Sequence, residues 1–198
     1  MAAAEHAVFV PGAQDALLVI DVQNDFLPGG ALGVPRGDEV VAPLNAWLRA
    51  FAAAQRPVFA SRDWHPPDHC SFREHGGPWP PHCIAGTHGA GFAGALELPA
   101  SAVIVSKATA PERDAYSAFA GTDLGARLAA LGVRRVIAGG LATDYCVLHT
   151  VLDARAAGFE VAVLLDAVRA VEAAPGDGAG ALERMRQAGA ELLGTLPP

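Results

Sequence analysis

Short apolar runs alternate along the chain with segments whose apolar residues recur at helical spacing. Residues 16–21 (ALLVID), 57–61 (PVFAS) and 102–107 (AVIVSK) are largely apolar over five or six positions, which predicts buried strands. Residues 38–54 instead repeat their apolar positions every three to four residues, which predicts an amphipathic helix. The apolar face of this helix would consist of Val40, Val41, Leu44, Trp47, Leu48 and Phe51.

The same alternation continues through the second half of the chain. Helical spacing after about residue 143 is expected to end at Gly158, because glycine favours helix C-termini. The pattern predicts, in order, a helix at 124–131, a strand at 134–140, a helix at about 143–157, a strand at 160–168, a helix at 180–189 and a short strand at 190–194.

Alternating strands and helices predict an α/β fold. Parallel strands need crossover connections, and right-handed crossovers place helices on both faces of the sheet. We therefore expect a three-layer α/β/α architecture with a central, mostly parallel sheet. The sequence has no internal repeat and no low-complexity linker, and 198 residues suffice for one sizeable core. A single domain over residues 1–198 is expected.

One long interval, residues 62–100, interrupts the alternation. It is rich in proline, glycine, histidine and tryptophan and follows the end of a predicted strand. Loops of this length inside a compact domain usually carry function or are disordered, and the tryptophan and histidine content favours function. Ligands of open parallel sheets bind beyond the carboxyl ends of the strands. The interval is therefore expected to form a metal- and substrate-binding region.

Composition excludes several classes of partner. The chain is 52% hydrophobic and 18% charged, with a formal net charge of -7. Because nucleic acids and anionic membranes bind clustered Lys and Arg, and no such cluster is present, neither is an expected partner. No apolar run approaches the roughly 20 residues that span a bilayer. Residues 1–12 lack the pattern of a signal peptide, so a cytoplasmic location is expected.

Chemically useful side chains stand where predicted strands end. Asp21 closes the first strand, Lys107 closes the third, and Cys146 follows the fourth at the start of a helix. Because the carboxyl ends of parallel strands share one edge of the sheet, these side chains are expected to meet. A partly desolvated carboxylate would have a raised pKa, which suits proton transfer. Taken singly, each could instead be an ordinary strand-end residue.

Cys146 has two readings. With Thr143 as N-cap, its sulfur would lie near free backbone amides, and the helix dipole would lower its pKa. A nucleophilic thiolate is then expected. Alternatively, Cys146 is a small buried apolar residue, since free cysteine is among the most buried residue types.

A second cluster has the composition of a metal site. Asp63 and His65 are spaced so that both face one side of an extended segment, and His82 could complete a three-ligand site. One carboxylate and two imidazoles suit Zn²⁺, Fe²⁺ or Mn²⁺, with open positions for substrate or water. His69 is a candidate fourth ligand. The remaining histidines are expected to be surface or core residues: His6, His75, His88 and His149.

The three cysteines, Cys70, Cys83 and Cys146, have no CxxC spacing, so a disulfide framework is not expected and a reducing compartment is. The main alternative to a catalytic metal is a structural zinc site that combines Cys70 or Cys83 with His65 and His82.

Taken together, these residues resemble the nicotinamidase/pyrazinamidase family within the isochorismatase-like cysteine hydrolases. LLVIDVQNDFLPGGAL is similar to the family's first strand and loop, and SRDWHPPDHCSF to its metal loop. WPPHCIAGTHGAGF resembles its second metal segment, DAYSAF its substrate-side motif, and GGLATDYCV its nucleophile turn. The resemblance covers nearly the whole chain and implies the isochorismatase-like fold. One departure is Ala108, where the family usually has glycine after the catalytic lysine.

The resemblance implies a role for each matching residue. The enzyme would convert nicotinamide to nicotinate and ammonia in NAD salvage, and pyrazinamide to pyrazinoate, through a thioester on Cys146. It would hold one divalent metal ion, Zn²⁺ or Fe²⁺ or else Mn²⁺. A cis peptide would join Leu141 to Ala142. The implied sets are catalytic Asp21, Lys107 and Cys146; oxyanion-hole Ala142 and Cys146; ring-lining Phe26, Leu27, Trp79 and Tyr116; and metal-binding Asp63, His65, His82 and His69.

Two other functions stay open at this point. The chain could be a related hydrolase or amidase that acts on another small substrate, such as a vinyl ether. It could also be a zinc-stabilised binding or redox-sensing domain in which Cys146 is inert. The small-molecule partner implied by the resemblance is nicotinamide, and the sequence leaves open whether the chain forms a homo-oligomer.

Overall fold

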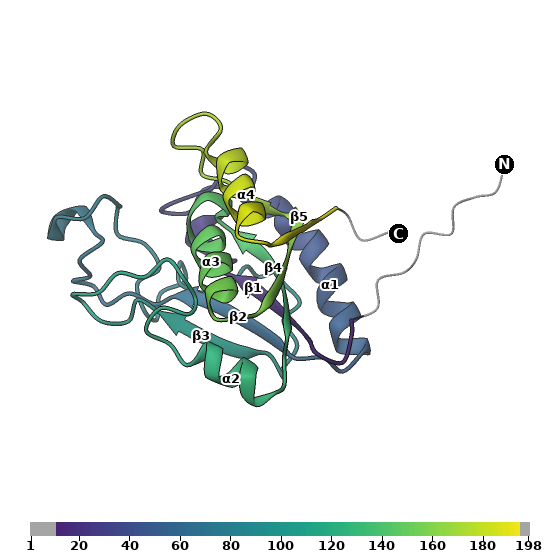
Figure 1. The fold of residues 1–198 in the computed structure, drawn as a ribbon. Helices are drawn as coiled ribbons and strands as arrows, with labels where there is room; N and C mark the ends of the chain where they lie inside the picture. Colours follow the sequence, from purple (N-terminus) through teal and green to yellow (C-terminus); the bar gives the residue numbers. More distant parts are fainter. Residues whose placement is uncertain (1–10, 195–198) are drawn as a thin grey trace.

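The computed structural model describes residues 11–194, so His6 and most of the N-terminal segment considered above lie outside the described residues. A six-stranded sheet forms the centre of the molecule, in the order β3-β2-β1-β4-β5-β6, and every neighbouring pair is parallel (Figure 1). The strands are β1 (Asp15–Ile20), β2 (Val58–Asp63), β3 (Val103–Lys107), β4 (Arg135–Leu141), β5 (Glu160–Arg169) and β6 (Glu191–Leu193).

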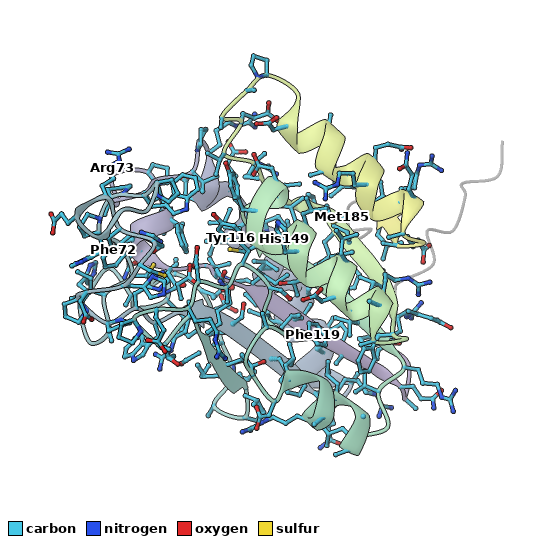
Figure 2. The ribbon with its side chains drawn as sticks, turned by 60° about the vertical axis from the view of Figure 1, so that its left-hand side comes forward. Phe72, Arg73, Tyr116, Phe119, His149 and Met185 are labelled. Carbon is cyan, nitrogen blue, oxygen red and sulfur yellow. The ribbon has the colours of Figure 1, made fainter. Side chains whose placement is uncertain are left out.

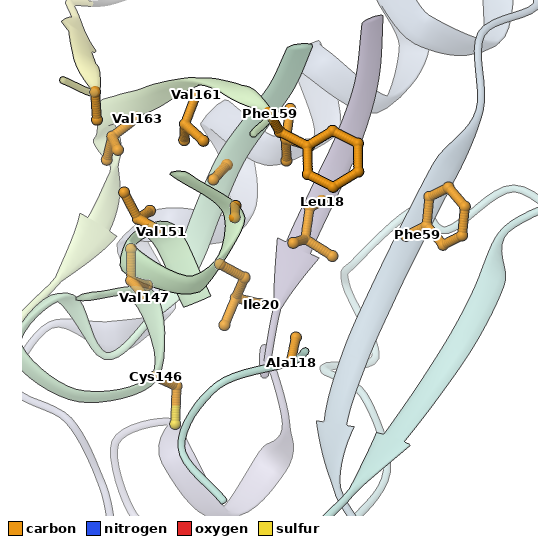
Figure 3. Close-up of a cluster of buried hydrophobic side chains, with 14 of the residues drawn as sticks. Leu18, Ile20, Phe59, Ala118, Cys146, Val147, Val151, Phe159, Val161 and Val163 are labelled. Atoms are coloured by element: carbon orange, nitrogen blue, oxygen red, sulfur yellow. The ribbon is translucent and has the colours of Figure 1, made fainter. Parts of the chain in front are cut away.

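Helices cover both faces of the sheet, as predicted. Alternate side chains of a strand point to opposite faces. Leu17 and Val19 of β1 accordingly join one apolar cluster with α1, whereas Leu18 and Ile20 join a second cluster with the other helices (Figure 3). The α-helices are α1 (Val41–Ala53), α2 (Leu124–Ala130), α3 (Leu148–Ala156) and α4 (Asp177–Gln187). The three-layer α/β/α architecture is therefore confirmed.

The predicted elements all exist, but several boundaries differ. The predicted helix at 38–54 begins with a 3₁₀ turn over Gly37–Val40 before α1. The helix predicted at 180–189 starts earlier, at Asp177. The largest difference concerns the helix predicted from 143, whose first turn, Thr143–Val147, is a π-helix that continues into α3. Turns of π-helix are rare, but many of those that occur lie at functional sites, and hydrophobic periodicity does not predict them.

Strand order reverses between β1 and β4, the two central strands, and such a reversal opens a crevice at the carboxyl edge of a sheet. Gly140 permits the strands to approach there, because a Cβ at this position would lie 2.0 Å from the Ile20 carbonyl oxygen. The long segment between β2 and β3 leaves the same edge, and it forms the loops at the left of Figure 1. Within residues 11–194, no helix is both long enough and apolar enough to cross a bilayer.

Candidate functional site

Three strand-end side chains meet in the crevice. Lys107 Nζ lies 3.0 Å from Asp21 Oδ2 and 3.5 Å from Cys146 Sγ. Asp21 follows β1 in a left-handed backbone conformation (φ 50°), which turns the chain out of the sheet. Lys107 reaches this point from β3, where it is paired in register with Asp63 of β2. The expected grouping of acid, ammonium and sulfur is therefore present, and all three side chains are buried.

Ser61, the Ala115 carbonyl and a second carboxylate, Asp63, complete the surroundings of this triad. Ser61 Oγ donates a hydrogen bond to Asp21 Oδ1 at 2.7 Å. Lys107 Nζ donates to the Ala115 carbonyl at 3.0 Å and also to Asp63 Oδ1. The ammonium group therefore lies between two buried carboxylates and the sulfur.

Burial and mutual charge set the protonation of these groups. Burial raises the pKa of Asp21, and the nearby Lys107 only partly offsets it. Burial would also raise the pKa of Asp63, but Lys107 and His65 hold it well below its usual range. For Lys107 the two carboxylates outweigh burial, so its pKa lies well above the ordinary value and the group stays a cation. Of the two acids, Asp21 is the one placed to gain and lose a proton.

The predicted low pKa of Cys146 is wrong. Burial raises the pKa of this thiol well above its ordinary value, and Asp21 and Asp63 add to the rise against the opposing effect of Lys107. Thr143 is not the N-cap either, because Ala142 holds that position and no side chain caps the turn. Cys146 lies at one end of the apolar cluster in Figure 3 and is 6% exposed. The raised pKa favours the thiol form of Cys146 over the thiolate.

A three-residue group beside the triad fits a divalent metal. One ligand atom each from Asp63, His65 and His82 lie within 4.8 Å of one another. Nδ1 of His65 donates to the Ala108 carbonyl at 3.1 Å, and Nδ1 of His82 donates to the Pro80 carbonyl at 2.8 Å. Both imidazoles are therefore oriented with Nε2 as the lone-pair atom. His65 Nε2 is buried without a hydrogen-bond partner, which is costly unless a cation binds there.

His69 lies beside this group. Its ring stacks on that of His65 with 4.1 Å between centroids. Nδ1 lies 2.7 Å from Ser71 Oγ, and Nε2 lies 3.1 Å from the Arg113 carbonyl oxygen. Both ring nitrogens thus have protein partners, and His69 could ligate a metal only by giving one of them up.

The cysteines do not support the structural zinc alternative. All three are free, and within residues 11–194 no close group of metal-ligand atoms contains Cys70 or Cys83. Burial raises the pKa of Cys83 far above its ordinary value. Its backbone N–H donates to Asp25 Oδ2 at 2.7 Å, so Asp25 supports the loop rather than the triad.

Gln23 is a supporting residue that the sequence did not indicate. Its side chain is fully buried and forms two hydrogen bonds with the backbone of Asp63. Oε1 accepts from the Asp63 N–H at 2.7 Å, and Nε2 donates to the Asp63 carbonyl at 2.8 Å. Nε2 also donates to the Ala90 carbonyl at 2.9 Å. One amide thereby ties the end of β2 to the long loop.

A pocket opens directly above Cys146, and three of the four predicted ring-lining residues border it. Leu27 does not, since it packs against the apolar cluster that includes α1. Asp21 and Lys107 are not among the lining residues, but Lys107 contacts Cys146, which is. The lining residues are Phe26, Leu32, Val34, Asp63, His65, Ser71, Trp79, His82, Asp114, Tyr116, Ala142, Tyr145, Cys146 and Val171.

Aromatic side chains form one wall of the pocket. Trp79 Nε1 donates to the Tyr116 hydroxyl at 3.1 Å. Tyr145, which the sequence reasoning missed, packs edge-on against both rings with centroids 5.3 and 5.5 Å away. His149 lies behind Tyr116, with 5.3 Å between the rings (Figure 2). The signal in the sequence that could have indicated Tyr145 was its position directly before Cys146.

The Leu141–Ala142 peptide bond in the backbone of the site is cis, as the family resemblance implies. Ala108 adopts φ 51°, the left-handed conformation for which glycine would be the usual choice. The turn therefore forms with alanine at this position, where the family usually has glycine.

Comparison with known proteins places the chain among enzymes. A model of the isochorismatase domain matches residues 15–195. The nicotinamidase of Escherichia coli (strain K12) is 39% identical over an alignment that covers 89% of this chain and 93% of that protein.

Solved structures agree with these matches. The pyrazinamidase of Pyrococcus horikoshii, in complex with zinc, is 49% identical with a TM-score of 0.88, covering 91% of this chain and 99% of the other. PnC1 from L. infantum, in complex with nicotinate, is 36% identical with a TM-score of 0.85, covering 94% of this chain and 96% of the other.

Proposed function

This chain belongs to the isochorismatase family, in its nicotinamidase/pyrazinamidase branch, and we propose that it hydrolyses nicotinamide to nicotinate and ammonia. The observation that carries the proposal is the contact of Lys107 with both Asp21 and Cys146 beneath an aromatic pocket. A cysteine, an acid of raised pKa and a fixed cation are the parts that acyl transfer through a thioester needs.

Asp21 acts as the proton carrier. Its carboxylate accepts the Cys146 proton as sulfur attacks the carboxamide carbon, and the resulting acid then protonates the departing nitrogen. Ammonia leaves and a thioester remains. Asp21, again a carboxylate, takes a proton from the attacking water and returns it to sulfur as the C–S bond breaks. Because burial raises the pKa of Asp21, proton gain and loss are both accessible.

Backbone amides would stabilise the charge that develops on the carbonyl oxygen. Ala142 and Cys146 border the pocket at its floor, and we assign their N–H groups to the oxyanion hole. One such donor contributes roughly 3–4 kcal/mol of transition-state stabilisation in comparable sites. Lys107 remains a cation throughout and favours the anionic forms of Asp21 and Cys146.

Asp63, His65 and His82 would hold one divalent metal ion. The unpartnered His65 Nε2 and the compact donor set fit Zn²⁺, and Fe²⁺ and Mn²⁺ accept the same ligands. Burial lowers the pKa of His82, so its imidazole stays neutral and able to ligate. When bound, the ion supplies a Lewis acid that can anchor the ring nitrogen of the substrate.

The pocket favours a neutral aromatic amide. Phe26, Trp79 and Tyr116 offer ring faces for a planar heterocycle. Two carboxylates, Asp63 and Asp114, border the same pocket, and among the described residues its lining contains no Lys or Arg. The Asp63 charge is paired with Lys107, but the lining within residues 11–194 offers no Lys or Arg to bind the two carboxylates of a vinyl ether such as isochorismate, which is therefore a disfavoured substrate. Pyrazinamide, which is also neutral and aromatic, is a further substrate that we propose.

The non-catalytic alternative, a zinc-stabilised binding domain, does not explain why Asp21, Lys107 and Cys146 are buried together. The proposed activity would serve NAD salvage. A reducing compartment such as the cytoplasm suits three free cysteines, and we propose that location.

Ammonia release from nicotinamide, measured with and without prior chelation, tests the proposal. We expect ammonia and nicotinate in equal amounts from the untreated protein, with the loss after chelation reversed by added Zn²⁺. If nicotinamide is left intact while another small amide is hydrolysed, the substrate assignment is wrong.

A further inference from the structure

The segment after β5 forms a part of the pocket wall that lies outside the catalytic and metal-binding sets. Val171 of this segment borders the pocket together with Cys146. Asp144, two residues before Cys146 in the π-helical turn, accepts hydrogen bonds from the Val171 N–H and the Glu172 N–H, both at 2.9 Å. The same turn therefore carries Cys146 and holds in place the backbone of a second residue that lines the pocket.

Glu172 extends this connection to α4. Its carboxylate accepts from the Gly176 N–H at 2.7 Å and from the Gly178 N–H at 2.9 Å. A Cβ on Gly178 would lie 2.7 Å from Ala170 Cβ as well as 2.6 Å from Glu172 Oε1, so the close approach favours glycine there. Glu172 itself has a left-handed backbone (φ 56°), an uncommon conformation for a residue with a side chain. Two carboxylates thus bind four backbone amides across one short segment.

The arrangement differs from simple helix capping. A cap for α4 alone would need only the bonds from Glu172 to Gly176 and Gly178. The Asp144 carboxylate instead holds the segment against the turn that presents Cys146. Hydrogen bonds to ionised carboxylates are stronger than neutral ones, so the position of Val171 relative to the sulfur is well defined.

We propose that Val171 is a specificity-determining residue that limits substituents on the aromatic ring of the substrate, and that Asp144 and Glu172 are its positioning residues. This inference rests on the proposed function. Val171 and Leu32 both pack against the apolar cluster that contains Val34, so these three residues form one apolar side of the pocket. A branched apolar side chain held at that side would contact the edge of an unsubstituted ring and would hinder a ring that carries an added methyl group there. The substrate class is therefore small, neutral, unsubstituted heteroaromatic carboxamides.

The test compares nicotinamide with its ring-methylated derivatives. Wild-type turnover of nicotinamide is measured first, because it decides the proposed function independently of the variants. We expect Val171→Ala to raise kcat/KM for at least one methylated amide, relative to nicotinamide, by about tenfold, a typical value for one methyl-sized difference in a pocket. A ratio within twofold of wild type for every derivative would overturn the assignment of Val171.

The positioning role is tested through Glu172. We expect Glu172→Ala to raise KM for nicotinamide about threefold or more with kcat nearly unchanged, and to relax the same substrate ratio. Glu172→Gln, which keeps one carbonyl acceptor, should fall between that variant and wild type. Glu160→Ala, an exposed glutamate at the start of β5, is the matched control and should change neither quantity.

Two further outcomes would contradict the proposal, one for the positioning role of Glu172 and one for the contact made by Val171. If Glu172→Ala lowers the melting temperature but leaves KM and the substrate ratio unchanged, Glu172 only caps α4. If Val171→Ala in a Cys146→Ala background binds nicotinamide as tightly as Cys146→Ala alone, by calorimetry, Val171 does not contact the ring. The binding measurement needs no turnover, so it is also informative should the protein prove inactive on nicotinamide.

Discussion

The ammonium group of Lys107 lies 3.5 Å from the sulfur of Cys146, although 39 residues separate the two in the chain. This proximity matters because burial raises the pKa of the thiol well above its ordinary value. A thiolate formed during the reaction therefore depends on the fixed cation, while Asp21, 3.0 Å from the same ammonium group, takes the proton. In the proposed mechanism, the thiol is therefore activated during the reaction.

Removal of the cation should damage both catalysis and stability. Lys107→Met would leave Asp21 and Asp63 buried without their shared counter-charge, and breaking a buried pair typically costs about 3–5 kcal/mol. We expect the free energy of unfolding in urea to fall by about that amount and kcat/KM to fall at least a hundredfold. Arg49→Met, at an exposed ion pair with Glu97, is the control and should change little. Near-normal activity in Lys107→Met would exclude the proposed role.

Substitution of the nucleophile should separate activity from folding. Cys146→Ala removes the only atom proposed to form the thioester, so turnover of nicotinamide should fall below detection. Metal content and melting temperature should stay close to wild type, because alanine fits a small buried site. Cys70→Ala is the matched control. Substantial ammonia release by Cys146→Ala would mean that another group attacks the carboxamide.

Strand-end reasoning predicted which residues meet, because the geometry of parallel sheets brings Asp21, Lys107 and Cys146 to one edge whatever the details of packing. It could not predict the sign of the Cys146 pKa shift, which depends on the depth of burial of that one atom. Val171 and Asp144 were also beyond its reach. Their contact joins segments 27 residues apart through backbone amides, and no residue pattern along the chain reports such a bond.

The pH profile should respond to Ser61. Activity falls as pH drops through the pKa of Asp21, because a protonated Asp21 cannot accept the Cys146 proton, and burial places this acid limb above the ordinary Asp value near 4. The Ser61 hydroxyl donates to the Asp21 carboxylate and so stabilises its charge. Ser61→Ala should therefore raise the pKa further and move the acid limb of kcat/KM to higher pH.

Ser61→Thr keeps the hydroxyl and serves as the control for this shift. Its acid limb should stay near that of wild type. An unchanged limb in Ser61→Ala would show that Asp21 does not set the profile.

Metal content should distinguish the histidines. His65→Asn removes the Nε2 atom, which has no hydrogen-bond partner in the protein, so bound zinc, measured by elemental analysis, should fall to a small fraction of one equivalent. His69→Asn should retain most of the zinc, because both ring nitrogens of His69 are occupied by Ser71 and Arg113. Equal zinc loss in the two variants would make His69 a full ligand.

Asp114 should influence the release of product. Its carboxylate is exposed and borders the pocket. One carboxylate oxygen accepts a hydrogen bond from the Ala115 N–H at 2.9 Å. The substrate is neutral but nicotinate is an anion, so a carboxylate at the pocket wall repels only the product. We expect Asp114→Asn to lower the inhibition constant of nicotinate about two- to fivefold at low salt, with KM for nicotinamide unchanged. The difference should vanish near 1 M salt, where the Debye length falls to about 3 Å.

Glu112→Gln removes an exposed charge outside the pocket lining and should have no such effect. An inhibition constant that does not change in Asp114→Asn, or that changes equally at high salt, would rule out electrostatic assistance of product release.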